Sequence, residues 1–115
     1  MSIGVAIVEP RLYVNVGYAA RIMKNCGVGK LFLVDPSYDV QEAIRFAMHG
    51  RDVLVSATIT NLKELRRGSR LLVGTTAIKS STRLNVLRDT ISSVQLADLL
   101  NALPKRDNIR IILGR

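Results

Sequence analysis

The sequence predicts an α/β domain in which a parallel sheet carries helices on both faces. Short apolar runs recur along the 115 residues, they alternate with segments of helical spacing or helix-capping residues, and each run is nearly continuous rather than alternately apolar and polar. Continuous apolar runs are typical of strands that are covered on both faces. Strands that alternate with helices favour right-handed crossovers between parallel neighbours.

Five of these runs are expected to form strands. They are Ile3–Val8, Lys30–Val34, Val53–Ser56, Arg70–Gly74 and Ile109–Leu113. In open parallel sheets, ligands bind beyond the carboxyl ends of the strands. A functional site is therefore expected in the loops that follow these runs.

The best-defined helix is predicted over Val16–Cys26, and Gly27 is placed to end it. Four apolar side chains in this segment have the i, i+3, i+4, i+7 spacing of one helix face. They are Ala19, Ile22, Met23 and Cys26. Because free cysteines are commonly buried, Cys26 is expected in the core rather than as a nucleophile.

Three more helices are predicted after the second strand. Gln41–Met48 and Asn61–Arg67 read as short helices, stopped by Gly50 and Gly68. Ser92 and Gln95 have the spacing of a capping box that opens a helix running to Leu103. The predicted order is therefore β-α-β-α-β-α-β-loop-α-β.

The composition indicates a globular protein with an anionic partner. Seventeen Lys and Arg against nine Asp and Glu give a net charge of +8, which favours nucleic acid, although a merely solvated basic surface is the alternative. The chain has no apolar run near the roughly 18 residues of a membrane span and no pattern of a secretory signal, so the cytoplasm is the expected location.

Metal chemistry and base stacking are not indicated. One cysteine and one histidine, Cys26 and His49, cannot supply a zinc site. Aromatic residues make up only 4% of the chain, so a platform on which single-stranded bases stack is not supported. Contacts to RNA are expected mainly at phosphates.

The loop after the first strand leads into a helix that carries Asn15, Gly17, Arg21 and Lys24. Free amides at a helix N-terminus attract phosphate. Gly17 leaves room for a close backbone approach, and Arg21 and Lys24 can grip one phosphate path. The alternative is a solvated helix face on which Gly17 is needed for packing.

The stretch Gly74-Thr75-Thr76-Ala77 follows the fourth strand and offers hydroxyls and small residues. A cofactor could lie against such a backbone, but an ordinary strand-to-loop turn explains the same residues. Lys79 and Arg83 add positive charge to the following loop, where a solvated surface is the alternative. The sequence contains neither a G-x-G-x-x-G fingerprint nor a Ser-His-Asp, Cys-His or paired-acid pattern.

Several motifs of the chain keep a common order and spacing. They are Val8-Glu9-Pro10, Asn15-x-Gly17-x-x-x-Arg21, Leu31-Phe32-Leu33-Val34-Asp35-Pro36, Ala47-x-x-Gly50-x-Asp52-Val53-Leu54 and Val73-Gly74-Thr75-Thr76-Ala77. Together they resemble the SpoU-like tRNA/rRNA ribose methyltransferases of the SPOUT superfamily. The resemblance spans essentially the whole chain and is closest to the branch that acts on the tRNA anticodon loop.

This resemblance implies transfer of a methyl group from S-adenosylmethionine to a ribose 2′-oxygen by a homodimer with a knotted α/β fold. Arg21 matches the family's catalytic arginine, and Asn15 would shape the same loop. Two stretches match cofactor-contacting residues: Thr75, Thr76, Ala77, and Leu113, Gly114, Arg115. The expected contacts to RNA are Gly17, Lys24, Lys79 and Arg83.

The chain departs from the family pattern in two places. Leu12, Tyr13 and Val14 stand where the family usually carries an Asn and a Gly. The family continues after its Gly-Arg strand end with the segment that forms the knot and most of the cofactor pocket, whereas this sequence ends at Arg115. Residues 1–115 are therefore expected to be the amino-terminal part of one such domain, with weak or absent cofactor binding and no activity alone.

Two other functions remain open at this stage. A non-enzymatic basic RNA-binding module derived from the same fold fits the net charge of +8. An unrelated flavodoxin-like or response-regulator-like interaction domain fits the order of elements, but no cluster of acids at the strand ends supports it.

Overall fold

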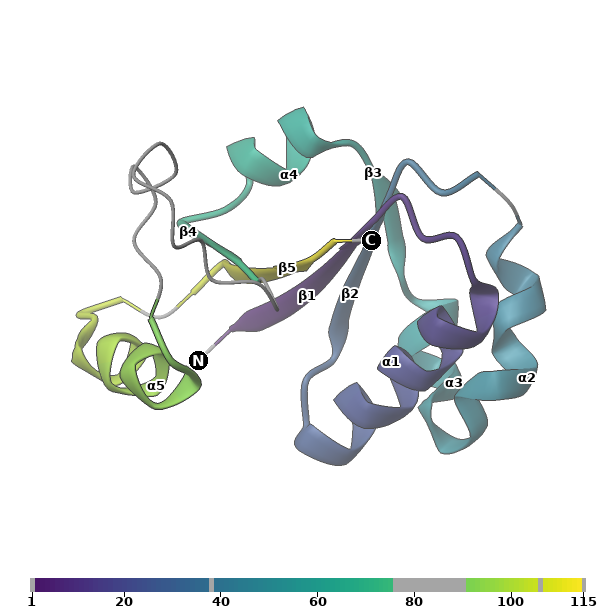
Figure 1. The fold of residues 1–115 in the computed structure, drawn as a ribbon, viewed down its shortest axis with the longest axis horizontal. Helices are drawn as coiled ribbons and strands as arrows, with labels where there is room; N and C mark the ends of the chain where they lie inside the picture. The colour runs from purple at the N-terminus through teal and green to yellow at the C-terminus, as the bar shows by residue number, and fades with distance from the viewer. Residues whose placement is uncertain (1, 38, 76–90, 106, 115) are drawn as a thin grey trace, which may run out of the picture.

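The computed structural model describes residues 2–37, 39–75, 91–105 and 107–114, and their strands form one parallel sheet in the order β3-β2-β1-β5-β4 (Figure 1). Each neighbouring pair is parallel. The strands are β1 (Ile3–Val8), β2 (Lys30–Val34), β3 (Thr58–Thr60), β4 (Leu71–Gly74) and β5 (Ile109–Leu113). The predicted fold class, an α/β domain with a parallel sheet, is confirmed.

The third predicted strand is wrong. Val53–Ser56 falls largely in helix α3 (Arg51–Val55), and the strand follows it at Thr58–Thr60. Val53 and Leu54 are both buried, whereas Val55 is 63% exposed. Two adjacent buried side chains followed by an exposed one fit a helix packed on one side, and a four-residue apolar run alone does not separate that helix from a buried strand.

Helix α1 (Tyr13–Cys26) begins three residues earlier than predicted and ends, as predicted, at Gly27. Gly27 has a φ of 73°, in the left-handed region that glycine adopts at little cost. Cys26 is exposed, so its expected place in the core is wrong.

The buried stripe of α1 is also rotated from the predicted one. Val16, Ala20 and Met23 are buried, whereas Ile22 is 61% exposed. The reason is that α1 packs against both the sheet and the helices that follow β2. The side chains that point between these two neighbours are therefore the buried ones.

The remaining helices cover both faces of the sheet (Figure 1). The predicted helix at Gln41–Met48 is broken into a 3-10 helix η1, α2 and a second 3-10 helix η2. Their bounds are η1 (Val40–Ala43), α2 (Ile44–Ala47) and η2 (Met48–Gly50). The last two helices are α4 (Leu62–Arg67) and α5 (Ser93–Ala102). The capping box is confirmed, because Ser92 Oγ accepts the Gln95 amide and Gln95 Oε1 accepts the Ser92 amide.

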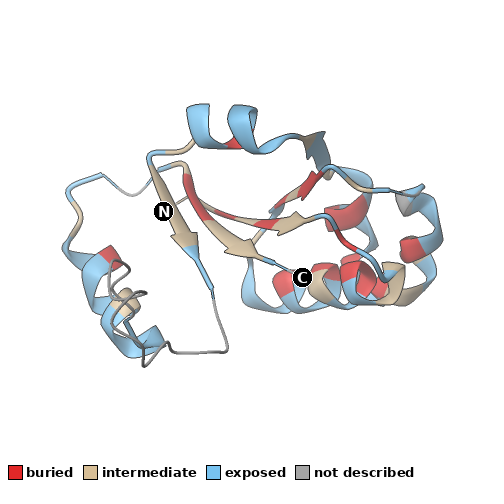
Figure 2. Cartoon of the chain, turned by 45° about the horizontal axis from the view of Figure 1, so that its top comes forward, coloured by how far each residue is buried: buried red, intermediate tan, exposed pale blue. Residues whose placement is uncertain are grey.

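Two apolar layers hold these elements together, and Figure 2 shows the buried residues concentrated along the sheet and on the sides of the helices that face it. The larger layer lies between the sheet and α1 to α3 and includes Val16, Leu33 and Leu54. The smaller layer, on the opposite face under α4, includes Ala6, Val34 and Leu65. The sheet is therefore packed on both faces, and the loops at its carboxyl edge project from it.

Candidate functional site

The carboxyl ends of β1 and β5 form the floor of a cavity. Because β1 and β5 are parallel neighbours with Ile7 opposite Leu113, the loops that follow them leave the sheet side by side. A cavity of about 490 Å³ opens there. It is lined by Ile7, Val8, Pro10, Arg11, Leu12, Asn15, Ala19, Leu113 and Gly114.

The cavity brings together residues predicted from distant parts of the sequence. Asn15 comes from the first turn of α1, and Leu113 and Gly114 come from the end of β5. Its size and mostly apolar lining, with a few polar groups, are those of a small-molecule site. The cavity is therefore a candidate binding site for a small molecule.

Thr75 lies at the neighbouring strand end. Its hydroxyl donates a hydrogen bond of 2.8 Å to the Ile112 carbonyl, and its backbone amide lies 3.2 Å from the same oxygen. This double contact ties the end of β4 to β5, one residue before Leu113. Five other predicted site residues lie outside the described residues: Thr76, Ala77, Lys79, Arg83 and Arg115.

Arg21 is exposed and is not among the residues that line the cavity. It follows Ala19, a cavity residue, by two positions, which corresponds to a rotation of about 200° around an α-helix. Arg21 therefore projects from the other flank of α1, on the side where Gly50 packs against the helix. Asn15 lies beside the ends of β1 and β5, whereas Arg21 faces a different surface.

That second surface also contains a polar pair one helical turn after Arg21. The His49 Nε2 and Asn25 Oδ1 atoms are 2.6 Å apart, with the ring N–H donating to the amide oxygen. This bond joins η2 to α1. Arg21 is thus flanked by a fixed connection between the two elements.

Gly17 is buried against the helices that follow β2. A Cβ atom at this position would lie 2.5 Å from Phe46 Cβ and 2.7 Å from the Ala43 carbonyl oxygen. The absence of a side chain therefore permits close packing of α1 on η1 and α2. This geometry agrees with the packing alternative for Gly17 rather than with a contact to RNA.

Lys24 is accessible but already has a carboxylate partner. Its Nζ atom lies 2.7 Å from Asp52 Oδ2, and the two side chains are 46% and 63% exposed. The hydrogen bond from Lys24 is the main cause that lowers the pKa of Asp52. A phosphate at Lys24 would compete with Asp52 for the same ammonium group.

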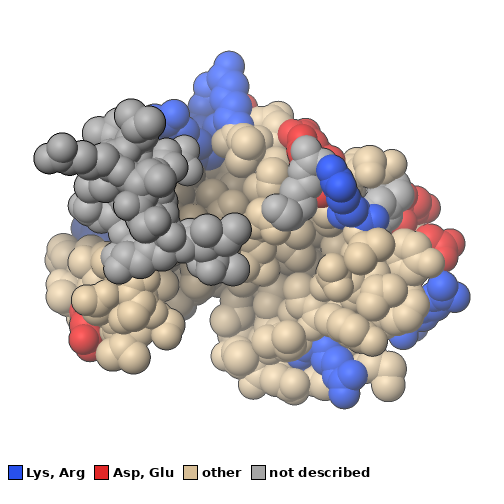
Figure 3. All heavy atoms as spheres, viewed as in Figure 1, with Lys and Arg blue, Asp and Glu red and all other residues tan. Residues whose placement is uncertain are grey.

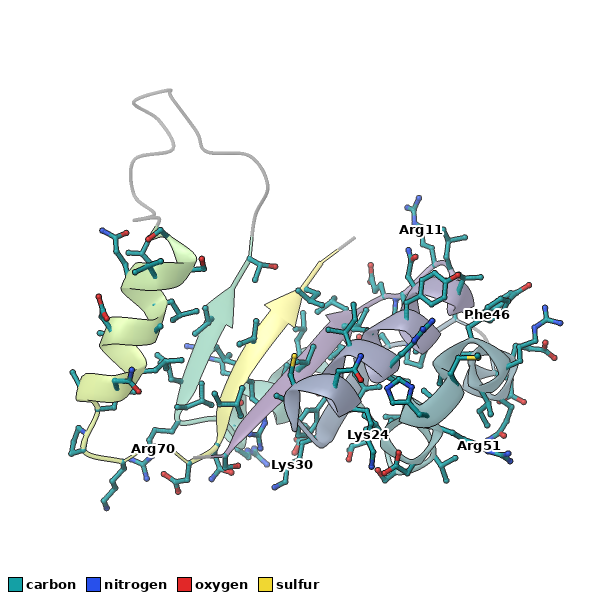
Figure 4. All side chains as sticks on the ribbon, turned by 90° about the horizontal axis from the view of Figure 1, so that it is seen from below. Arg11, Lys24, Lys30, Phe46, Arg51 and Arg70 are labelled. Carbon is teal, nitrogen blue, oxygen red and sulfur yellow. The ribbon has the colours of Figure 1, made fainter. Side chains whose placement is uncertain are left out.

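Basic side chains on the described part of the chain are spread rather than gathered. Figure 3 shows Lys and Arg groups scattered over one face, with uncharged surface and acidic groups between them. In Figure 4, Arg11 lies near the carboxyl end of the sheet, whereas Arg70 and Lys30 lie at the opposite end. Arg70 is paired with Asp107 at 2.8 Å, and that bond lowers the pKa of Asp107.

Sequence reasoning missed the cavity residues Pro10, Arg11, Leu12 and Ala19. The signal available was position alone, since the first three fill the short loop between β1 and α1 at the ligand edge. Leu12 lines the cavity and is 61% exposed. Among the described residues, no group of three or more His, Cys, Asp or Glu is placed to hold a metal ion. None of the described helices is long and apolar enough to span a membrane.

The fold and the site define a class of protein: a parallel α/β domain with an apolar small-molecule cavity at the carboxyl edge of its sheet and a basic helix beside it. No family model matches the sequence. The whole chain is similar, however, to tRNA (cytidine-2′-O-)-methyltransferase TrmJ of Sulfolobus acidocaldarius, with 30% identity over 117 residues, and to the protein of the same name from Methanocaldococcus jannaschii, with 34% identity.

The chain spans about half the length of these curated relatives, 48% and 50%. Solved structures agree at the level of the fold. TrmJ from Z. mobilis ZM4 matches 99% of this chain with 50% of its own, with a TM-score of 0.84 and 24% identity. A probable methylase family protein from Haemophilus influenzae Rd KW20 has a TM-score of 0.83 and 23% identity, and the chain covers 46% of it. The predicted resemblance to ribose methyltransferases is confirmed.

Proposed function

We propose that this chain forms the amino-terminal part of a tRNA ribose 2′-O-methyltransferase that uses S-adenosylmethionine and acts in the cytoplasm. One observation supports this most strongly. The two full-length relatives are named as tRNA 2′-O-methyltransferases, and Asn15, Leu113 and Gly114, which the resemblance assigns to the site, line one cavity.

The cofactor would occupy the cavity between α1 and β5. Leu113 and Gly114 would contact it from the strand end, with Thr75 holding the neighbouring strand in place. Thr76, Ala77 and Arg115 are assigned to the cofactor by the resemblance. When bound, S-adenosylmethionine supplies a methyl group on a positively charged sulfur, and the apolar lining would exclude water from that group.

Arg21 would act on the RNA rather than on the cofactor. Its guanidinium stays protonated at neutral pH, so it is suited to hold the target phosphate and to stabilise negative charge that develops on the ribose oxygen. Because Arg21 lies on the flank of α1 away from the cavity, a homodimer would allow one protomer's Arg21 to serve the partner's cavity. The homodimer is part of the proposal.

Lys24, Lys79 and Arg83 are proposed as contacts to the RNA backbone. Such contacts are independent of base sequence and depend strongly on salt concentration. Asn15 would position the loop at the mouth of the cavity, where cofactor and ribose have to meet. The net charge of +8 would draw RNA to the surface as a whole.

A second function is a non-enzymatic RNA-binding module. The observation that favours it is the separation of Arg21 from the cavity within one chain. Such a module would bind RNA with a steep dependence on salt and would transfer no methyl group.

The experiment that separates the two functions uses a chimera. Residues 1–115 replace the matching half of the Sulfolobus acidocaldarius TrmJ, and transfer of label from methyl-labelled S-adenosylmethionine to unmodified tRNA is measured. If residues 1–115 are part of a methyltransferase, the chimera gives labelled tRNA and the 115-residue chain alone gives none. A folded chimera that binds tRNA but transfers no label would favour the RNA-binding module.

A further inference from the structure

Three aromatic rings gather at the amino-terminal half of α1, although the sequence contains few. Tyr13 and Tyr18 come from α1, and Phe46 comes from α2. The Phe46 ring centroid lies 5.7 Å from that of Tyr13 and 6.3 Å from that of Tyr18, and the Tyr18 and Phe46 rings are nearly perpendicular at 88°. These distances are those of favourable ring contacts.

An arginine closes one side of this aromatic cluster. The Arg45 guanidinium carbon lies 4.9 Å from the Phe46 ring centroid and 5.8 Å from that of Tyr13, within the range of cation–π attraction. Tyr13 and Phe46 are half-buried, whereas Tyr18 is 49% exposed. Phe46 therefore contacts the Tyr18 ring edge to face, while about half of Tyr18 stays open to solvent.

Tyr18 and Arg21 are neighbours on α1. Residues three positions apart lie one turn from each other on the same helix surface. The Gly50 backbone packs directly against α1 at Ala20 and Arg21, which fixes η2 on the other side of the arginine. Arg21 thus lies on α1 between an exposed aromatic residue and the residue that bonds His49, Asn25.

We infer that Tyr18, packed against Phe46, binds an unpaired nucleobase of the RNA next to the phosphate that Arg21 holds. This inference rests on the proposed function, because that function supplies the RNA and the role of Arg21. An exposed ring one helical turn from a guanidinium group matches a ligand that combines an aromatic base with a charged phosphate. The positive charge favours nucleic acid as the occupant of this surface, and the exposed ring favours a single strand, whose bases are free to stack.

The structure changes the expectation drawn from composition. Scarce aromatic residues did not indicate a stacking surface, yet three of them converge on one end of α1. In Figure 4, Phe46 and Arg11 lie toward the same end of that helix, so the proposed base would approach the domain from the side of its carboxyl edge.

The test measures binding of two labelled RNAs to the 115-residue chain by fluorescence anisotropy. One is an oligouridylate, and the other has the same number of phosphates but abasic riboses, so the electrostatic attraction is matched. Tyr18→Leu is expected to weaken binding of the oligouridylate by about fivefold to a hundredfold and to leave binding of the abasic RNA unchanged. Tyr18→Phe, which keeps the ring, is expected to bind both RNAs like the unaltered chain.

Controls separate this inference from the proposed function. Leu99→Ala removes an exposed apolar side chain on α5, which is 47% exposed, and is expected to change neither affinity. The inference is overturned if Tyr18→Leu weakens binding of both RNAs equally or of neither, or if the unaltered chain binds neither RNA. Arg21→Ala is tested beside Tyr18→Leu. If Arg21→Ala weakens binding of both RNAs and Tyr18→Leu weakens binding of neither, the proposed phosphate contact is supported and the base contact is not.

Discussion

The backbone of Gly50 lies against the Cα atom of Arg21. A Cβ atom at Gly50 would be 2.7 Å from Arg21 Cα and 2.5 Å from the Ala20 carbonyl oxygen. These are backbone atoms of a helix, so they can give way only if α1 or η2 moves. The close approach of two elements distant in the sequence thus holds Arg21 at a defined place.

Gly50→Ala is expected to destabilise the fold by roughly 1 to 3 kcal/mol, the usual cost of overpacking. Gly68→Ala is the matched control, because its Cβ would meet only the Glu64 carbonyl oxygen at 3.6 Å, an ordinary contact. That control is expected to be neutral or to stabilise by up to about 1 kcal/mol through the unfolded chain. Urea unfolding measures both, and equal stability of the two variants would show that the packing at Arg21 is not tight.

Ala19→Phe is expected to fill the cavity and abolish cofactor binding. Ala19 lines the cavity from α1, so a large ring there takes the volume that the cofactor needs. Val94→Phe is the control, since Val94 is 69% exposed on α5. Calorimetric titration of S-adenosylmethionine into the chimera with each change measures the effect. Unaltered cofactor binding by Ala19→Phe would show that the cofactor does not occupy this cavity.

Asp52→Asn is expected to strengthen RNA binding. The change releases Lys24 from its 2.7 Å ion pair and leaves its ammonium free for phosphate. The slope of log affinity against log salt concentration should steepen by up to about one phosphate contact. Asp98→Asn changes the net charge equally on α5. If Asp98→Asn strengthens RNA binding as much as Asp52→Asn, the cause is the change in net charge and not the release of Lys24.

The same pair predicts a dependence of stability on pH. The pKa of Asp52 is lowered below its ordinary value of 3.8, mainly by the hydrogen bond from Lys24. A lowered pKa in the folded state contributes stability above pH 3.8, and this contribution is lost as the pH falls through the lowered pKa. Thermal unfolding should therefore show Asp52→Asn less stable than the unaltered chain at neutral pH, with the difference vanishing in acid. A difference that persists in strong acid would assign the effect to helix α3 rather than to the ion pair.

Sequence patterns were sufficient for most of the sheet. The runs at β1, β2 and β5 have the predicted bounds because continuous apolar segments between turns leave few other structures. Pattern failed at Val53 and Leu54, where a short apolar run packs as a helix against α1. Only the tertiary arrangement decides between the two.

The sequence predicted which residues belong to the site better than it predicted the directions of their side chains. The resemblance assigned Asn15 and Gly114, which the fold brings to one cavity. It did not reveal that Arg21 lies on the opposite flank of α1, because the direction of a helical side chain depends on which stripe the helix buries. The aromatic cluster around Phe46 was equally hidden, since Tyr18 and Phe46 are 28 positions apart in the sequence.

The most direct measurement is the position of the methyl group in tRNA treated with the chimera and labelled S-adenosylmethionine. A methyl group on the ribose 2′-oxygen blocks alkaline cleavage at that nucleotide, so the label should appear in an alkali-resistant dinucleotide. Arg21→Ala should reduce this product by about a hundredfold or more. Label that is absent, or that appears on a base, with a folded chimera and an active Sulfolobus acidocaldarius TrmJ alongside, would contradict the proposed function.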